Sequence, residues 1–108
     1  MRTSIRLFQN AQLTLFTRVH CSLCDTAKNT IAKLRERKPF TYSEIDVMTP
    51  QNKRWKDVYE FDVPVLHVQR VLSTSNDGGE TLSDPKKLFH RFTEQEVEKA
   101  IKEVEELI

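Results

Sequence analysis

The spacing of hydrophobic and polar residues in the first half of the chain predicts a helix between two strands. Residues 12–17 form a short apolar run with β character, which predicts a strand. Apolar residues then recur at helical spacing, which predicts a helix from about residue 22 to residue 37. Pro39 ends that helix, because proline has no amide proton to donate. Residues 40–47 are rich in aromatic and β-branched side chains and predict the second strand.

A second helix and a third strand follow. Thr49 and Pro50 are typical of a helix start, with a capping hydroxyl and a proline at the first helical position. The next apolar residues have helical spacing, and we expect them to form a buried stripe: Trp55, Val58 and Tyr59. Residues 63–68 predict a strand that opens with proline, one of the few places where a strand tolerates it.

The last third of the chain predicts a loop, a strand and a helix. Residues 71–85 lack apolar periodicity and contain both glycines, so we expect an irregular and mobile loop there. Residues 88–92 predict the fourth strand. Thr93 and Glu96 have the spacing of a capping box. The helix that follows presents one apolar face: Val97, Ile101, Val104 and Ile108.

The resulting order, β-α-β-α-β-β-α, predicts an α/β fold with a mixed four-stranded sheet flanked by helices. Strands that are joined through a helix pair in parallel with a right-handed crossover, and the last two strands can pair as a hairpin. A chain of 108 residues forms one domain. We expect that domain to span residues 12–108, behind an N-terminal tail of residues 1–11.

The charge balance and the composition exclude several classes of function. Seventeen basic side chains face sixteen acidic ones, so no basic surface for nucleic acid is predicted. No apolar run is long enough for a membrane span. Two cysteines cannot cross-link a disulfide-rich secreted scaffold, so we expect the reducing cytoplasm. We also expect a monomer. Because the first 18 residues contain no acidic side chain, mitochondrial targeting stays an alternative.

The two cysteines lie three positions apart, in Cys21-Ser22-Leu23-Cys24. Such a pair can open and close a disulfide, or it can supply half of a tetrahedral metal site. The pair falls between a predicted strand and a predicted helix, where the helix dipole favours a thiolate on Cys21. The three histidines lack the spacing of a zinc module, so we expect no metal. Two buried structural thiols are a further alternative.

This element order, with the cysteine pair at the first strand–helix junction and Val63-Pro64 before the third strand, resembles the glutaredoxin and thioredoxin families. The resemblance extends over residues 12–108. The stretch Cys-Ser-Leu-Cys-Asp-Thr-Ala at residues 21–27 is most similar to small glutaredoxin-like proteins. The resemblance implies a thioredoxin-like fold, a redox-active centre used in electron transport, and a cis peptide bond at Pro64. It also implies that the backbone of Val63 pairs with a bound thiol substrate.

Two departures from the glutaredoxin pattern bear on glutathione. Glutaredoxins carry Cys-Pro-Tyr-Cys, whereas Ser22 and Leu23 stand between the cysteines here. Glutaredoxins also hold the γ-glutamyl end of glutathione with a Gly-Gly turn and an acidic residue before the last helix, and residues 89–93 contain no glycine. We therefore expect no bound cofactor, and glutathione is a doubtful reductant.

The sequence thus predicts a thiol–disulfide oxidoreductase that acts on protein or glutathione disulfides and is recycled by a cellular reductant. Cys21 is the expected nucleophile, and Cys24 is expected to resolve the mixed disulfide. By resemblance, Val63 and Pro64 bind the substrate. The candidates for electrostatic support of the thiolate are Arg18 and His20. The alternative from another class is a redox-inert module that binds a protein or peptide in the groove beside the proline.

Overall fold

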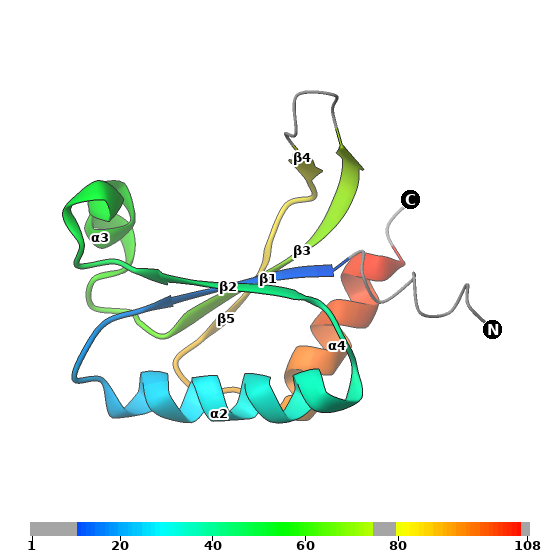
Figure 1. Ribbon diagram of the computed structural model, residues 1–108, viewed down its shortest axis with the longest axis horizontal. Coiled ribbons are helices and arrows are strands. Elements are labelled where there is room, and N and C mark those ends of the chain that lie inside the picture. The colour runs from blue at the N-terminus through cyan, green and yellow to red at the C-terminus, as the bar shows by residue number, and fades with distance from the viewer. Residues whose placement is uncertain (1–10, 75–79, 107–108) are drawn as a thin grey trace.

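The computed structural model describes residues 11–74 and 80–106, which form a sheet with helices on both faces (Figure 1). In chain order the elements are β1 (Ala11–Thr17), α2 (Ser22–Arg37), β2 (Thr41–Asp46), the 3₁₀ turn η1 (Pro50–Asn52), α3 (Lys53–Tyr59), β3 (Val65–Thr74), β4 (Glu80–Leu82), β5 (Lys86–Phe89) and α4 (Glu94–Glu105). The predicted alternation of strands and helices is confirmed. The structure adds one short strand, β4, between the predicted third and fourth strands.

Four strands form the central sheet in the order β2-β1-β3-β5. β1 and β2 are parallel, because α2 crosses over between them. β3 runs antiparallel to β1, and β5 runs antiparallel to β3. β3 continues beyond this sheet and pairs with β4 as a two-stranded extension (Figure 1). The sheet is therefore mixed, as predicted. The expectation that strands joined through a helix run parallel is wrong for β2 and β3, which α3 connects: β2 is parallel to β1, whereas β3 is antiparallel to it.

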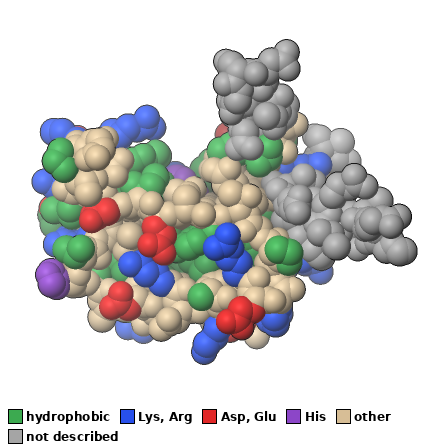
Figure 2. Space-filling model, in the orientation of Figure 1, with side chains coloured by type: hydrophobic (Ala, Val, Ile, Leu, Met, Phe, Trp, Pro, Cys, Tyr) green, Lys and Arg blue, Asp and Glu red, His purple; other side chains and the backbone are tan. Residues whose placement is uncertain are grey.

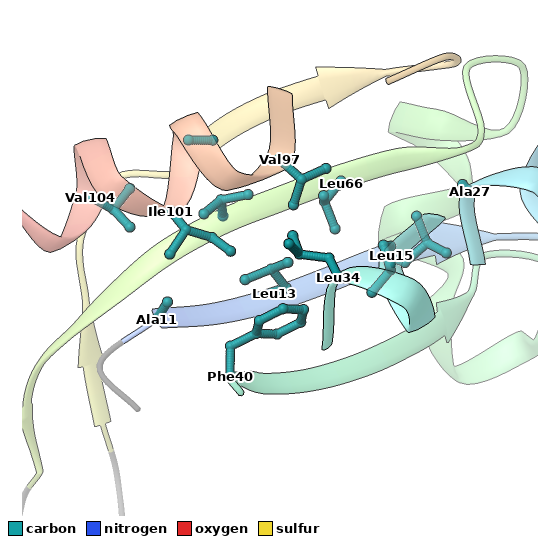
Figure 3. Close-up of a cluster of buried hydrophobic side chains, with 13 residues drawn as sticks. Ala11, Leu13, Leu15, Ala27, Leu34, Phe40, Leu66, Val97, Ile101 and Val104 are labelled. Carbon is teal, nitrogen blue, oxygen red and sulfur yellow. The ribbon is translucent and has the colours of Figure 1, made fainter. Parts of the chain in front are cut away.

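Two clusters of buried side chains fill the two faces of the sheet. α2 and α4 cover one face, and α3 lies on the other (Figure 1). The cluster under α2 and α4 is aliphatic apart from one phenylalanine (Figure 3): Ala11, Leu13, Leu15, Ala27, Ile31, Leu34, Phe40, Leu66, Val68, Val97, Ala100, Ile101 and Val104. The cluster under α3 is smaller: Phe16, Val47, Tyr59 and Val65, with Trp55 packed against it. Alternation along β1 and β3 separates the two sets, because successive strand residues point to opposite faces.

The prediction of an irregular loop over residues 71–85 is wrong for residues 71–74 and 80–82. β3 runs through Thr74, and β4 pairs with its end. A two-stranded extension beyond the main sheet needs no alternation of apolar and polar residues, so the hydrophobic pattern of the sequence does not predict it. The mobility expected there stays a prediction, and residues 75–79 lie outside the described part of the chain.

The fourth strand and the buried stripe of α3 also differ from the prediction. β5 ends at Phe89 instead of residue 92, because His90 has a positive φ of 61° and turns the chain out of the extended conformation. Val58 is 58% exposed instead of buried. α3 has only seven residues and packs through Trp55 and Tyr59, one turn apart, so Val58 lies on its flank.

The bounds of α2 and the start of α4 agree with the prediction, whereas the expected capping by Thr49 is wrong, because its hydroxyl donates to the Asp46 carbonyl at 3.0 Å. α4 begins with the capping box: Glu96 N donates to Thr93 Oγ1 at 3.1 Å, and Thr93 N donates to Glu96 Oε1 at 2.9 Å. Ile108, expected on the apolar face of this helix, lies outside the described residues. Within residues 11–74 and 80–106, no helix is long and apolar enough to cross a membrane. The same residues contain no group of three histidine, cysteine or acidic side chains that could hold a metal ion.

Candidate active site

Cys21 occupies the capping position at the start of α2. Its backbone is extended, with φ −122° and ψ 106°, while its carbonyl accepts a hydrogen bond from Asp25 N at 3.2 Å and closes the first helical turn. The amide of Cys24 donates to Cys21 Sγ at 3.2 Å. The first amides of a helix have no intrahelical acceptor, and such donors stabilise a thiolate. The helix start therefore favours ionisation of Cys21.

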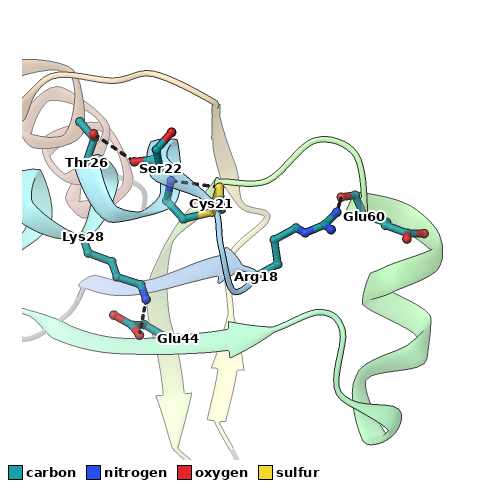
Figure 4. Close-up of a disulfide and its surroundings, with 8 residues drawn as sticks. Arg18, Cys21, Ser22, Thr26, Lys28, Glu44 and Glu60 are labelled. Carbon is teal, nitrogen blue, oxygen red and sulfur yellow. Dashed lines mark hydrogen bonds and ion pairs between the residues drawn. A yellow bond between two sulfur atoms is a disulfide. The ribbon is translucent and has the colours of Figure 1, made fainter.

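The two cysteines differ in exposure, as expected from their places in the helix. Cys24 is fully buried, whereas Cys21 is partly exposed. Their sulfur atoms form a disulfide, and their Cα atoms lie 5.2 Å apart (Figure 4). That separation is in the usual disulfide range of about 4.4–6.8 Å. An external sulfur can therefore approach Cys21 and not Cys24.

The loop between α3 and β3 contains the other expected binding residues. The Val63–Pro64 peptide bond is cis, as the resemblance implies. Pro64 is buried, and its carbonyl accepts a hydrogen bond from His90 N at 2.8 Å. Among the described residues, the backbone N–H and C=O of Val63 have no hydrogen-bond partner. Unpaired backbone groups of this kind can pair with an extended polypeptide.

Both segments line one open depression of about 390 Å³. Its lining residues are Arg18, His20, Cys21, Ser22 and Leu23 from the segment that leads into α2, and Glu60, Phe61 and Val63 from the segment after α3. The exposed cysteine and the unpaired backbone of Val63 therefore share one space. A larger depression of about 530 Å³ lies along α2 and β2, and neither cysteine lines it.

The two expected electrostatic supports both line this depression, with different surroundings. Arg18 Nη1 donates to the carbonyl oxygen of Glu60 at 3.3 Å, and the side chain extends away from the disulfide toward the end of α3 (Figure 4). His20 is exposed and has a positive φ of 59°. Among the described residues, the His20 ring has no hydrogen-bond or ion-pair partner.

Phe61 lines the depression, although no hydrophobic pattern in the sequence predicts a role for it. Its side chain is 86% exposed, and hydrophobic side chains reach the surface around α3 (Figure 2). Phe61 follows the end of α3 and does not continue the helical spacing of apolar residues, so that spacing predicts neither its burial nor its exposure. The available signal is a large apolar residue immediately before Asp62-Val63-Pro64.

A buried hydrogen bond lies beneath the loop that contains Phe61. Tyr59 Oη and His67 Nε2 are 2.7 Å apart, and the His67 ring packs edge-on against Phe16 with ring centroids 4.6 Å apart. Burial, with a smaller contribution from the Lys87 cation, lowers the pKa of His67 to about 4. The ring is therefore neutral at pH 7. Because Tyr59 ends α3, this bond ties the start of the loop to β3.

A smaller depression of about 180 Å³ lies between the start of α2 and the start of α4. Leu23 and Thr93 are among its lining residues. The capping box of Thr93 and Glu96 occupies donors at the start of α4. The first turn also contains the carboxylates of Glu94 and Glu96. The lining also includes the cation of Arg91, and Glu94 is paired with Arg37 at 2.9 Å. The capping box, rather than the charge, therefore limits the donors that are open to an anionic group there.

The cysteine pair at the start of α2 and the sheet with helices on both faces define a thioredoxin-like fold. A mutant thioredoxin from Halobacterium salinarum matches with a TM-score of 0.63 over 97% of this chain and 83% of its own, at 19% identity. A Thermus thermophilus thioredoxin matches with a TM-score of 0.58 over 95% of this chain and 82% of its own, at 18% identity. At these identities the likeness shows the fold.

Sequence comparison identifies the family within this fold. A family model described as "Glutaredoxin-like domain (DUF836)" matches residues 12–102, and the chain belongs to this family. A glutaredoxin-like protein of Dictyostelium discoideum is 39% identical over 62 residues, which are 54% of this chain and 57% of that protein. The match thus spans little more than half the length of that relative. Both cysteines of the disulfide lie within the residues that the family model matches.

Proposed function

We propose that this protein is a thiol–disulfide oxidoreductase that cycles the Cys21–Cys24 pair between dithiol and disulfide. In the first step, the Cys21 thiolate attacks one sulfur of a substrate disulfide. A mixed disulfide forms on Cys21, and the other substrate sulfur leaves as a thiolate and takes a proton from water.

In the second step, the Cys24 thiol loses its proton and its sulfur attacks Cys21 Sγ. The Cys21–Cys24 disulfide forms and the second substrate thiol leaves, so the substrate gains two electrons and two protons and the protein loses them. A dithiol, or two molecules of a monothiol, must then reduce the protein and be oxidised to a disulfide.

The difference in exposure between the cysteines is the observation that supports this mechanism most strongly. Cys21 is partly exposed and receives the Cys24 amide on its sulfur, whereas Cys24 is fully buried one turn further along α2. A nucleophile must meet the substrate, and a resolving thiol needs to meet only the mixed disulfide. Each cysteine is therefore suited to one of the two steps.

A redox titration of the Cys21–Cys24 couple tests this proposal against a redox-inert binding module. The exposed Phe61 beside the unpaired backbone of Val63 would suit either function. We expect a reversible two-electron transition between roughly −300 and −120 mV, the span of catalytic couples. A couple that stays oxidised far below this range would support the binding module instead.

We propose polypeptide disulfides, rather than glutathione mixed disulfides, as the substrates. The capping box at the start of α4 occupies donors that the carboxylate of a γ-glutamyl group would need there. The unpaired backbone of Val63 and the apolar ring of Phe61 suit an extended polypeptide.

Two assays on the same preparation distinguish these substrate classes. Reduction of insulin disulfides is compared with reduction of a glutathione mixed disulfide of a small thiol. We expect the larger kcat/KM for insulin. A larger kcat/KM for the glutathione substrate would contradict the proposed substrate class and leave the dithiol mechanism intact.

A further inference from the structure

Arg18 joins the two walls of the depression at the disulfide. It lies three residues before Cys21, and its Nη1 donates to the Glu60 carbonyl 42 positions along the chain. Glu60 is the C-cap residue of α3, three positions before Val63. Within the described residues, this is the one hydrogen bond between residues 18–24 and residues 60–64.

The loop between α3 and β3, which forms one wall of the depression, makes few other backbone hydrogen bonds. Asp62 N donates to the Tyr59 carbonyl at 2.9 Å, and the Pro64 carbonyl accepts from His90 N at 2.8 Å. These bonds hold the two ends of the loop. Between them, Phe61 is 86% exposed and Val63 has no backbone partner in the described structure. The Val63 side chain also packs against the cluster under α3, and Asp62 Oδ1 lies 3.9 Å from His90 Nε2. None of these contacts reaches the segment of Cys21, so we expect the bond to Glu60 to help set the distance from Val63 to Cys21.

The direction of the Arg18 side chain distinguishes this contact from electrostatic support of the thiolate. The guanidinium lies at the Glu60 carbonyl, and the side chain leads away from the sulfur atoms (Figure 4). A cation at the carboxyl end of a helix also meets the negative end of its dipole. The charge of Arg18 is thus directed at α3, while the Cys24 amide donates to the Cys21 sulfur.

We propose that Arg18 is a positioning residue that sets the separation between Cys21 and the substrate-pairing backbone of Val63. This inference rests on the proposed disulfide exchange, for which a polypeptide must contact both walls at once. Loss of the bond would let the Glu60–Val63 segment move, so extended substrates would bind less well. The intrinsic reactivity of Cys21 would not change.

The test uses Arg18→Met, which removes the guanidinium and keeps an unbranched apolar stem, and Arg18→Lys, which keeps the charge. Lys33→Met is the matched control, since Lys33 is exposed on α2 and the substitution removes the same charge. Three properties are measured on each full-length protein. They are amide exchange of residues 60–63, the Cys21 thiol pKa from the pH dependence of alkylation, and KM for insulin and for a small disulfide.

Within residues 60–63 the amides of Glu60 and Asp62 are the hydrogen-bonded ones, so their exchange reports on the segment. We expect it to be faster in Arg18→Met and unchanged in Lys33→Met. KM for insulin should rise roughly 2- to 13-fold in Arg18→Met, the range that corresponds to losing one typical, partly exposed hydrogen bond. KM for the small disulfide and the thiol pKa should stay as in the wild type. Arg18→Lys should lie between the wild type and Arg18→Met, because lysine lacks the fixed fork of guanidinium donors.

A raised Cys21 thiol pKa in Arg18→Met, restored by Arg18→Lys, would overturn the inference in favour of electrostatic support. Unchanged exchange at residues 60–63 would overturn it as well. The exchange measurement does not depend on catalysis. If the wild-type protein reduces neither insulin nor the small disulfide, the proposed function fails, and the exchange of residues 60–63 still decides whether Arg18 holds the loop.

Discussion

The two faces of the sheet differ in composition, and each supports one wall of the candidate site. The face under α2 and α4 is filled with aliphatic side chains and holds the helix that contains both cysteines. The face under α3 is aromatic and includes the buried His67–Tyr59 hydrogen bond. It supports the loop of Phe61 and Val63. We refer to these as the α2 side and the α3 side.

Under the proposed function, this difference separates chemistry from recognition. On the α2 side, the sulfur of Cys21 is partly exposed and the sulfur of Cys24 is buried. The close-packed core beneath α2 holds both cysteines in these positions. The α3 side presents backbone and an aromatic ring, which can bind a substrate and cannot exchange electrons. Substitutions on the α2 side should therefore stop the reaction or unfold the protein, and those on the α3 side should change affinity or pH dependence.

The largest expected effect comes from the cysteines. Cys21→Ser should abolish disulfide exchange, because no accessible sulfur nucleophile remains. Cys24→Ser should still attack but should not resolve, so the substrate stays bound to Cys21 as a mixed disulfide. Intact-mass spectrometry after incubation with a disulfide substrate detects that adduct. An adduct on Cys24 in the Cys21→Ser protein, with none on Cys21 in the Cys24→Ser protein, would reverse the roles.

The next effect concerns the stability of the α2 side. Leu34 lies in α2 and is fully buried in the aliphatic cluster. Leu34→Ala should lower the free energy of unfolding by about 2–5 kcal/mol, because it leaves a cavity in a close-packed core. Urea unfolding of both proteins measures this change. The exposed neighbour gives the control, since Lys33→Ala should change stability by no more than about 0.5 kcal/mol.

The buried histidine makes the α3 side sensitive to acid. The pKa of His67 is lowered to about 4 in the folded protein, below the ordinary value of 6.5. Between these two pH values the unfolded chain binds a proton that the folded chain does not, so stability should fall as the pH drops from 6.5 to 4. The contribution is at most about 1.4 kcal/mol per pH unit.

His67→Gln isolates this effect, because it removes the titrating ring and leaves the other groups in place. Urea unfolding at several pH values should show a shallower loss of stability in the variant than in the wild type. Equal slopes for the two proteins would mean that His67 does not titrate differently on folding.

The smallest expected effect concerns recognition by Phe61. Phe61→Ala should raise KM for insulin roughly 3- to 10-fold, because an exposed aromatic ring at a binding site contributes apolar contact. The free energy of unfolding should change little, since the ring is 86% exposed. Val58→Ala removes an exposed apolar side chain that does not line the depression, and it should leave KM unchanged. Equal KM values for both variants would remove Phe61 from the substrate site.

Much of the fold follows from local patterns. The helix before Pro39 and the capping box at Thr93 can be predicted from the sequence, because helical spacing and capping depend on residues three or four positions apart. The continuation of β3 through Thr74 cannot be predicted in this way, because the residues that pair with β4 show no alternation of apolar and polar side chains. Val58 was misassigned for a related reason. Spacing indicates which residues share a face, and it does not show how wide the buried stripe is.

The candidate site divides in the same way. By itself, the sequence determined the cysteine pair and its place at a helix start, because spacing and helix polarity are local properties of the chain. Only the tertiary structure decided that Arg18 contacts Glu60, and that Tyr59 meets His67 across a helix–strand junction. It also decided that Phe61 is exposed beside Cys21. Such contacts depend on how the helices pack against the sheet. All of the core side chains together determine that packing.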